Sequence, residues 1–231
     1  GDFSKKEQIP WMFELYVDYF GLDPKRCYVS VWGGDETVAR DDEAIEIWKE
    51  TFKKYGIDAK YSDEITNIPS SIKEGNDWEF RIFPYGKEDN WWQRGPETPG
   101  ELGGPTSELF YDLGDVQYEE DTYHINDDSG RFLEVGNSVF MEYKFGEDGK
   151  WHEMEQKNID FGGGFERIVV AAQDKNSIYE TDIMTPYLEK IEALSGEKYD
   201  PSNPNDPKVQ SFRIIAEHAR AATFILADGV R

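Results

Sequence analysis

Basic residues are scarce in this sequence. Lysine and arginine total 25 against 48 aspartates and glutamates, so the 231 residues carry a formal net charge of −23 at pH 7. Phosphate groups are bound by cationic side chains, so this balance disfavours non-specific binding of this segment to nucleic acid or to an anionic membrane. An acidic surface favours solubility, and the same composition can also reflect a high-salt habitat.

Cysteine, histidine and long apolar runs are also scarce. The single cysteine, Cys27, excludes an internal disulfide and a cysteine-rich metal site, so a reducing cytosol is the expected setting. No apolar run approaches the roughly 18 residues of a membrane span, and the first residues have no signal-peptide pattern. The three histidines are expected at surface or capping positions, without a catalytic or metal-binding role.

Aromatic residues, by contrast, are plentiful. They make up 15% of the chain, with seven tryptophans, and apolar residues make up 38%. This content predicts a folded protein despite the high charge. The length suits one large domain or two small ones with a substantial core.

Helical periodicity marks five segments. Residues 4–20 are expected to form a helix with a capping box at Ser4 and Glu7, a kink or restart at Pro10 and an end at Gly21. Its buried face is predicted to hold Trp11, Phe13, Leu15, Val17 and Phe20. Further helices are expected over 41–55, 165–173, 183–195 and 208–227, the last with an apolar face of Val209, Phe212, Ile215, Ala216, Ala219, Ala222 and Leu226.

Strands are expected over 26–32, 79–83, 107–112 and 132–143, with a last strand before Asp160. Residues 84–107 are interpreted as a long functional connection, 57–76 as irregular with one short helix, and 115–130 as an acidic surface insertion. The Gly136–Asn137 pair predicts a bulge or a ligand near the backbone, and 145–151 a hairpin turn. The pattern predicts an α+β fold of antiparallel strands flanked by helices.

The stretch 158–168 (NIDFGGGFERI) concentrates polar chemistry beside three glycines. Glycines between a strand and a helix let the backbone approach a ligand closely. The free N–H groups of the following helix suit a phosphate or carboxylate, and Arg167 adds a fork of donors. Taken alone, the stretch fits a ligand-binding junction and a tight turn with a surface ion pair equally well.

Five blocks in chain order resemble the catalytic domain of class II aminoacyl-tRNA synthetases, and among them the alanyl-tRNA synthetases. Residues 159–168 (IDFGGGFERI) resemble that family's third motif, IDTGMGLERI, and 89–92 (DNWW) resemble its DNFW segment. Residues 104–114 (GPTSELFYDLG) are similar to GPCSEIFYDxG, 133–143 (LEVGNSVFMEY) to LEIWNLVFMQYN, and 211–230 to SIRVIADHIRAxTFLIADGV. The opening GDFSKKE is similar to the FGDYFKKE that follows the second motif.

The resemblance implies an amino-acid pocket and an ATP site. It implies that Asp160 pairs with the ammonium group of alanine, that Asn137 hydrogen-bonds the amino acid and that Val139 limits the side chain to a methyl group. It implies that Arg167 binds the γ-phosphate of ATP. The remaining implied contacts are Trp92 and Gly162 with the amino acid, and Gly164, Val135, Gly136, Asn137 and Trp92 with ATP.

The implied activity is alanine–tRNA ligation. Alanine, ATP, Mg²⁺ and tRNA(Ala) are the implied substrates and cofactors, with a cytoplasmic setting and no membrane. Because the alanine carboxylate is itself a nucleophile, catalysis would need only positioning and charge stabilisation, with no protein nucleophile.

Three departures from the family pattern stand out. Gly136 replaces a tryptophan, Gly163 replaces a methionine, and both cysteines of GPCGPCSE are missing. A glycine at 136 would open volume beside the amino acid, or a neighbour such as Trp91 would fill it. Strict specificity for alanine therefore depends on what occupies this space.

The resemblance also implies a domain organisation. Residues 1–198 would be a partial catalytic domain truncated at its N-terminus, 199–207 a linker, and 208–231 the start of the helical tRNA-recognition region. The first two class II motifs and the editing domain would lie outside these residues, so little activity is expected of this piece alone. The alternative is a stand-alone relative that binds amino acid or nucleotide, or that acylates a carrier.

Overall fold

The computed structural model describes residues 2–63, 68–69, 79–114, 122–127 and 129–230. The chain forms two compact units, Gly1–Ala172 and Gln173–Arg231. Much of the segment 57–76, where one short helix was expected, and half of the expected insertion at 115–130 lie outside the described residues. No described helix is long and apolar enough to cross a membrane.

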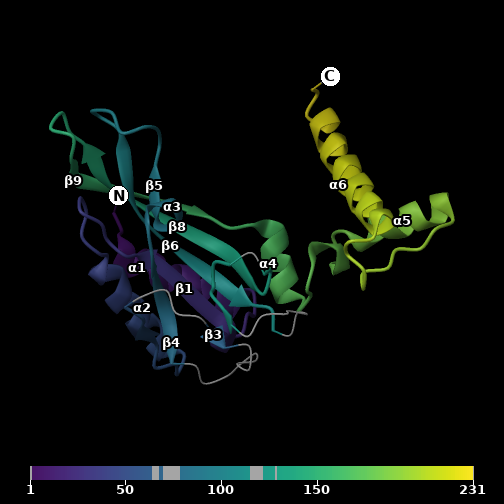
Figure 1. Ribbon diagram of the computed structural model, residues 1–231, viewed down its shortest axis with the longest axis horizontal. Coiled ribbons are helices and arrows are strands. Elements are labelled where there is room, and N and C mark those ends of the chain that lie inside the picture. Colours follow the sequence, from purple (N-terminus) through teal and green to yellow (C-terminus); the bar gives the residue numbers. More distant parts are fainter. Residues whose placement is uncertain (1, 64–67, 70–78, 115–121, 128, 231) are drawn as a thin grey trace. The chain divides into compact units, whose positions relative to one another are not determined.

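The first unit is built on a mixed sheet (Figure 1). Its strands, in the order β2-β4-β1-β6-β8-β9 with β5 paired to β6, are β2 (Lys60–Tyr61), β4 (Phe80–Tyr85), β1 (Cys27–Trp32), β6 (Leu102–Asp112), β8 (Phe132–Phe145), β9 (Trp151–Gly162) and β5 (Trp91–Gln93). The β1–β4 and β2–β4 pairs are parallel, and the other pairs are antiparallel. Strands β3 (Ile68–Pro69) and β7 (Thr122–Tyr123) form a separate pair. The α+β prediction is confirmed, with two parallel pairs added to the expected antiparallel sheet.

Two helices, α1 (Lys5–Glu14) and α2 (Asp42–Lys54), pack together against the sheet (Figure 1). The ring of Phe13 contacts those of Trp48 and Phe52 edge-on. Trp48 Nε1 donates to Ser107 Oγ of β6 at 2.8 Å, and Gln8 Nε2 donates to Ser138 Oγ of β8 at 3.2 Å. Ser107 and Ser138 therefore mark the helix-covered face of the sheet, and the residues directly before and after them on each strand face the other way.

The predicted buried face of the first helix is wrong at two aromatic positions. Trp11 is 52% exposed and Phe20 is 38% exposed. Helix α1 passes through Pro10 without a break and continues as a π-helix over Leu15–Tyr19. The residues that face the core are instead Ile9, Met12, Phe13 and Tyr16, which follow the i, i+3, i+4, i+7 spacing of an uninterrupted helix.

The expected long connection at 84–107 is also wrong. It contains α3 (Lys87–Asn90), β5 and the first residues of β6. Gly103 and Gly104 belong to β6, and these two strand positions require glycine because their neighbours leave no room for a side chain. A Cβ on Gly104 would lie 1.8 Å from the carbonyl oxygen of Phe140, and one on Gly103 would lie 2.8 Å from the Trp151 ring. These glycines permit close packing of strands where the sequence pattern indicated a turn.

The bulge and the hairpin were predicted correctly. In the β6–β8 pairing, Leu109 is opposite Gly136 and Phe110 is opposite Glu134, which leaves Val135 as the extra residue of a bulge. Strands β8 and β9 are joined by a turn in which Gly149 has a φ of 73°. The extra residue lies two positions before Asn137 and directly before Gly136, beside the predicted Gly136–Asn137 pair.

Helix α4 (Phe165–Ala172) ends the first unit, and the second unit contains a 3-10 turn (Ile178–Glu180), α5 (Thr185–Ser195) and α6 (Pro207–Ala227). Helix α5 ends at Gly196, whose φ is 75°. Met184, Leu188, Phe212 and Ala216 form the buried contact between α5 and α6. Ile215 and Leu226, expected on the apolar face of α6, are 50% and 66% exposed. The domain boundary at 199–207 stays a prediction.

Candidate active site

A row of four residues crosses the sheet of the first unit. Ser30 of β1 is opposite Glu108 of β6, Glu108 is opposite Asn137 of β8, and Asn137 is opposite Gly162 of β9. Side chains of directly opposed residues lie on one face of a sheet. Ser107 and Ser138 face helices α1 and α2, so their neighbours Glu108 and Asn137 face the other side. The row therefore lies on the face that α1 and α2 do not cover.

Two aromatic clusters on the same unit contain strand residues that neighbour this row. The first cluster is Tyr28, Phe83, Tyr85, Phe110, Ile125 and Phe132. The second cluster is Trp32, Val38, Trp91 and Trp151. Tyr28 and Trp32 lie two residues before and after Ser30 and so share its face of β1. The polar row thus crosses β1 between two apolar groups, which limits the water around its side chains.

A chain of hydrogen bonds joins the row to α3. Asn90 Nδ2 donates to Ser30 Oγ at 2.9 Å, and Ser30 Oγ donates to Glu108 Oε2 at 3.1 Å. Asn137 Nδ2 donates to the other carboxyl oxygen, Oε1, at 2.9 Å. Burial raises the pKa of the Glu108 carboxyl to about 7, with the nearby Glu134 acting in the same direction and the Ser30 hydrogen bond opposing it. Glu108 is thus a partly buried carboxylate whose pKa of about 7 lies near neutral pH.

Two amide oxygens of this network are buried and have no hydrogen-bond partner among the described residues. They are Oδ1 of Asn90 and Oδ1 of Asn137. A buried acceptor without a partner costs free energy, so such atoms often mark a place where a ligand or water donates. The Asn137 oxygen suits a group that carries N–H or O–H.

Asp160 lies in the next row of the sheet. It is directly opposite Val139 of β8, and Val139 is opposite Thr106 of β6. Asp160 is exposed, and its Oδ1 accepts from the backbone N–H of Phe161 at 2.9 Å. β9 is the last strand of the described sheet, so no further strand lies beside Asp160.

The glycine junction connects β9 to α4 as predicted. A Cβ on Gly162 would meet no atom within 4 Å, so the space beside it is open to a ligand. A Cβ on Gly164 would lie 3.1 Å from the Arg167 side chain. Arg167 Nη1 donates to Glu134 Oε2 at 2.8 Å, and the guanidinium-bearing side chain is 49% exposed. The ion pair expected of a simple turn is present, and half of the arginine side chain stays available to an anion.

The other predicted contacts are spread over both faces of the sheet. Trp92 is half-buried on β5, opposite Gly104. Val135 is fully buried, and its carbonyl accepts from Tyr16 Oη at 2.5 Å. A Cβ on Gly136 would lie 2.6 Å from the same hydroxyl. The structure therefore brings Asn137, Val139, Asp160 and Gly162 together and places Val135 and Gly136 against the helix-covered side.

Tyr16 fills the space that the two glycine replacements leave. A Cβ on Gly163 would also lie 2.6 Å from Tyr16 Oη. Trp91, which the sequence suggested as one neighbour that would fill this volume, instead packs against Trp32 and Trp151. Nothing in the sequence signalled Tyr16. Glu108 and Asn90 lie within the quoted blocks 104–114 and 89–92. Their place in those blocks is the only sequence signal that could have identified them as site residues.

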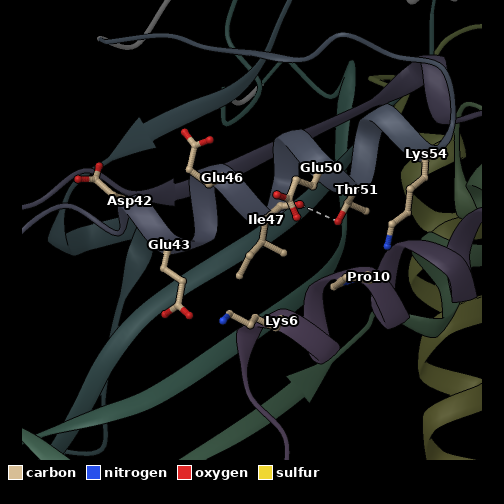
Figure 2. Close-up of a pocket in the computed structure, with 9 residues that line it drawn as sticks. All are labelled: Lys6, Pro10, Asp42, Glu43, Glu46, Ile47, Glu50, Thr51 and Lys54. Carbon is tan, nitrogen blue, oxygen red and sulfur yellow. Dashed lines mark hydrogen bonds between the residues drawn. The ribbon is translucent and has the colours of Figure 1, made fainter.

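A hollow of about 510 Å³ lies between α1 and α2, away from this row. Figure 2 shows α2 along one side and Lys6 and Pro10 of α1 along the other. Its lining consists of Lys6, Pro10, Asp42, Glu43, Glu46, Ile47, Glu50, Thr51 and Lys54. It shares no residue with the predicted site, so it is not the candidate active site.

Known proteins match the chain from end to end. The family described as tRNA synthetases class II (A) matches residues 1–231. The alanine–tRNA ligase of Rubrobacter xylanophilus is 35% identical over 240 residues, those of Treponema pallidum 37% over 234 and Thermotoga maritima 36% over 232. Each match covers 100% of this chain but only 24%, 33% and 23% of the relative. The chain thus spans about a quarter to a third of the length of these relatives.

Proposed function

Because this chain belongs to the class II tRNA synthetases, we propose that it contributes the amino-acid and ATP pocket of an alanine–tRNA ligase. The observation that carries the proposal is the pair of adjacent rows on β8 and β9. They place Asn137 opposite Gly162 and Val139 opposite Asp160, so four of the predicted amino-acid-binding positions are neighbours. Asn137 and Val139 come from β8, and Asp160 and Gly162 come from β9, so the pairing of the two strands joins them.

The proposed reaction joins alanine to AMP and then to tRNA(Ala). A carboxylate oxygen of alanine attacks the α-phosphorus of ATP, a carbon–oxygen–phosphorus linkage forms, and pyrophosphate leaves with the electron pair of the broken bond. A ribose hydroxyl of the tRNA then displaces AMP from the adenylate. Positioning and charge stabilisation supply the catalysis, because the attacking carboxylate is already ionised.

The chain offers groups for each part of alanine. Asp160 supplies a carboxylate and Asn137 an unpartnered oxygen for the ammonium group. Val139, opposite Asp160, is placed to limit the side chain to a methyl group, and half-buried Trp92 supplies an aromatic wall. A methyl group contributes only about 1–3 kcal/mol, so rejection of larger amino acids by volume is easier than rejection of glycine.

ATP would be held at the glycine junction. The open space beside Gly162 and the exposed half of Arg167 suit a polyphosphate at the start of α4. Mg²⁺ bound with ATP would neutralise phosphate charge, and it keeps waters and takes only one or two protein carboxylates. Glu134, paired with Arg167, is the carboxylate nearest the phosphate-binding arginine that could serve.

Calorimetric titration with a non-hydrolysable alanyl-adenylate analogue tests the proposal. We expect the chain to bind the analogue and Asp160→Ala to lose that binding. Asp148→Ala is the matched control, because Asp148 is exposed in the β8–β9 turn and its carboxylate bonds to the backbone N–H of Lys150 in that turn and to the exposed His152 ring at the start of β9. Binding that survives Asp160→Ala would contradict the proposed pocket. Binding without ATP–pyrophosphate exchange would favour the alternative of a binding module.

A further inference from the structure

The two ends of the Asn137 amide are used differently. Its Nδ2 donates to Glu108 Oε1 at 2.9 Å, whereas its Oδ1 is buried without a partner among the described residues. An ionised carboxylate has only acceptors, so it must receive the N–H₂ end of the amide. The ionised form of Glu108 therefore decides which end of Asn137 is left for a ligand.

Glu108 is itself oriented from the other side. Asn90 Nδ2 donates to Ser30 Oγ, and Asn90 and Ser30 are both fully buried. Asn90 is anchored in turn by its bonds to the carbonyl and hydroxyl oxygens of Thr106 at 3.2 and 3.1 Å. Because Ser30 Oγ accepts from Asn90, its own hydrogen is free to point at Glu108 Oε2. Both carboxyl oxygens of Glu108 are thus engaged by fixed donors.

We propose that Glu108 is a positioning residue that holds the Asn137 amide with its oxygen turned toward the ammonium group of the bound amino acid. This inference rests on the proposed function for the identity of the ligand. The orientation of Asn137 by Glu108 is a property of the chain itself. An ammonium group brings three N–H donors and no acceptor, so it needs the oxygen end of the amide. An inverted Asn137 would present N–H₂ to the cation and repel it.

The charge on Glu108 makes this orientation sensitive to pH. Burial raises the pKa of Glu108 to about 7; Glu134 of β8 and Asp89 of α3 act in the same direction, and Arg167 of α4 opposes them. Protonated Glu108 can donate to the Asn137 oxygen, which lets the amide invert. A bound cation favours the ionised carboxylate, so binding of the amino acid is expected to release a proton near pH 7.

Nuclear magnetic resonance of the ¹⁵N-labelled chain tests the orientation without any ligand. Asn137→Asp identifies the side-chain N–H₂ signals of Asn137 by their loss. We expect these signals to shift with a midpoint near pH 7 in the parent chain and to lose that transition in Glu108→Gln. Signals that do not change between pH 5 and 9, or that titrate equally in Glu108→Gln, would overturn the proposal.

Titration of the same variants with the alanyl-adenylate analogue tests the consequence. A carboxamide oxygen at 108 can still accept from Asn137, so Glu108→Gln should keep the parent's affinity within about threefold, whereas Glu108→Ala should weaken it about tenfold. Affinity for ATP alone should change in neither variant. Equal weakening by Gln and Ala would overturn positioning as the role. If the parent does not bind the analogue, the proposed function fails for this chain, and the resonance measurement still decides the role of Glu108.

Discussion

The hydroxyl of Tyr16 donates to the carbonyl oxygen of Val135 at 2.5 Å, which joins the π-helix after α1 to the bulge of β8. The same hydroxyl lies 2.6 Å from the position of a Cβ on either Gly136 or Gly163. Burial raises the pKa of Tyr16, with Glu134 adding to the effect, so the phenol stays a donor throughout the usual pH range. The side chain of Tyr16 therefore supports the backbone of both β8 and the glycine junction from the helix-covered face of the sheet.

Tyr16→Phe should lower the free energy of unfolding by about 1–3 kcal/mol, because the buried carbonyl of Val135 loses its donor. Urea unfolding followed by tryptophan fluorescence measures the change in the first unit, since all seven tryptophans precede residue 172. Tyr19→Phe is the control, because Tyr19 is 75% exposed. Equal effects of the two substitutions would contradict the role of the Tyr16 hydroxyl.

Gly163→Ala should destabilise the first unit more than Gly162→Ala. A Cβ at 163 meets the Tyr16 hydroxyl at 2.6 Å, whereas a Cβ at 162 meets nothing within 4 Å. Overpacking of this kind costs about 1–3 kcal/mol. Because Tyr16→Phe removes the crowding oxygen, Gly163→Ala should cost less in that background. A double-mutant cycle by urea unfolding gives the coupling, and simple additivity would count against the predicted contact.

Lys5→Met should be strongly destabilising. Lys5 Nζ lies 2.9 Å from Asp41 Oδ2 and 2.7 Å from Glu142 Oε2, and all three side chains are at most 9% exposed. Burial lowers the pKa of Lys5, but the two carboxylates outweigh it and raise the pKa above its ordinary value. Removal of the cation leaves two buried carboxylates together, with the more distant Lys157 Nζ 3.6 Å from Glu142 Oε1, so the expected cost is about 3–5 kcal/mol.

The matched control for this prediction is Lys6→Met, since Lys6 is exposed and has the same length and charge. The stabilisation by Lys5 is fully present below its ordinary pKa of 10.5 and is lost only as the pH rises through the higher folded value. The difference between the two variants should therefore be constant between pH 7 and 9. A small effect of Lys5→Met in urea unfolding would show that water reaches the two carboxylates.

Glu108→Gln should stabilise the first unit at alkaline pH. The folded chain keeps a proton on Glu108 between its ordinary pKa of 4.5 and about 7, whereas the unfolded chain has lost it. The free energy of unfolding of the parent therefore falls as the pH rises through this window. Gln removes that dependence, so its advantage should grow from none near pH 4.5 to at most about 3 kcal/mol at pH 8.

Urea unfolding at a series of pH values measures this difference, with Glu155→Gln as the control because Glu155 of β9 is exposed. An advantage of Glu108→Gln that does not change with pH would contradict the raised pKa of Glu108. An equal stabilisation by Glu155→Gln would show that the effect comes from the change in net charge and not from Glu108. The prediction concerns stability alone and does not depend on any ligand.

Elements with a strong local pattern were predictable from the sequence. The strand expected at 26–32 is β1, and the helix expected at 41–55 is α2. The prediction for residues 84–107 was wrong because Gly103 and Gly104 locally indicate a turn. In the structure they lie within a strand, where the close approach of Trp151 and Phe140 requires glycine. The predicted burial of Trp11 was wrong. Pro10 suggested a kink or restart, whereas the helix continues through it without a break.

Part of the candidate site was likewise predictable from the sequence, and part was not. The quoted motifs identified Asn137, Val139, Asp160 and Gly162, which the strand pairing brings together. Their burial could not be predicted, because the exposure of Asp160 follows from the position of β9 at the edge of the described sheet. The support from Tyr16 depends on contacts with residues more than a hundred positions away, which no local pattern records.

The row from Ser30 to Gly162 has a consequence for how the chain folds. Its members come from β1, β6, β8 and β9, and the pairing of β1 with β6 closes a loop of about 80 residues. Contacts of such long sequence separation form late and slow the folding of a domain. The binding groups are therefore expected to assemble only in the final cooperative step, so a partly folded chain would hold much of its secondary structure and no pocket.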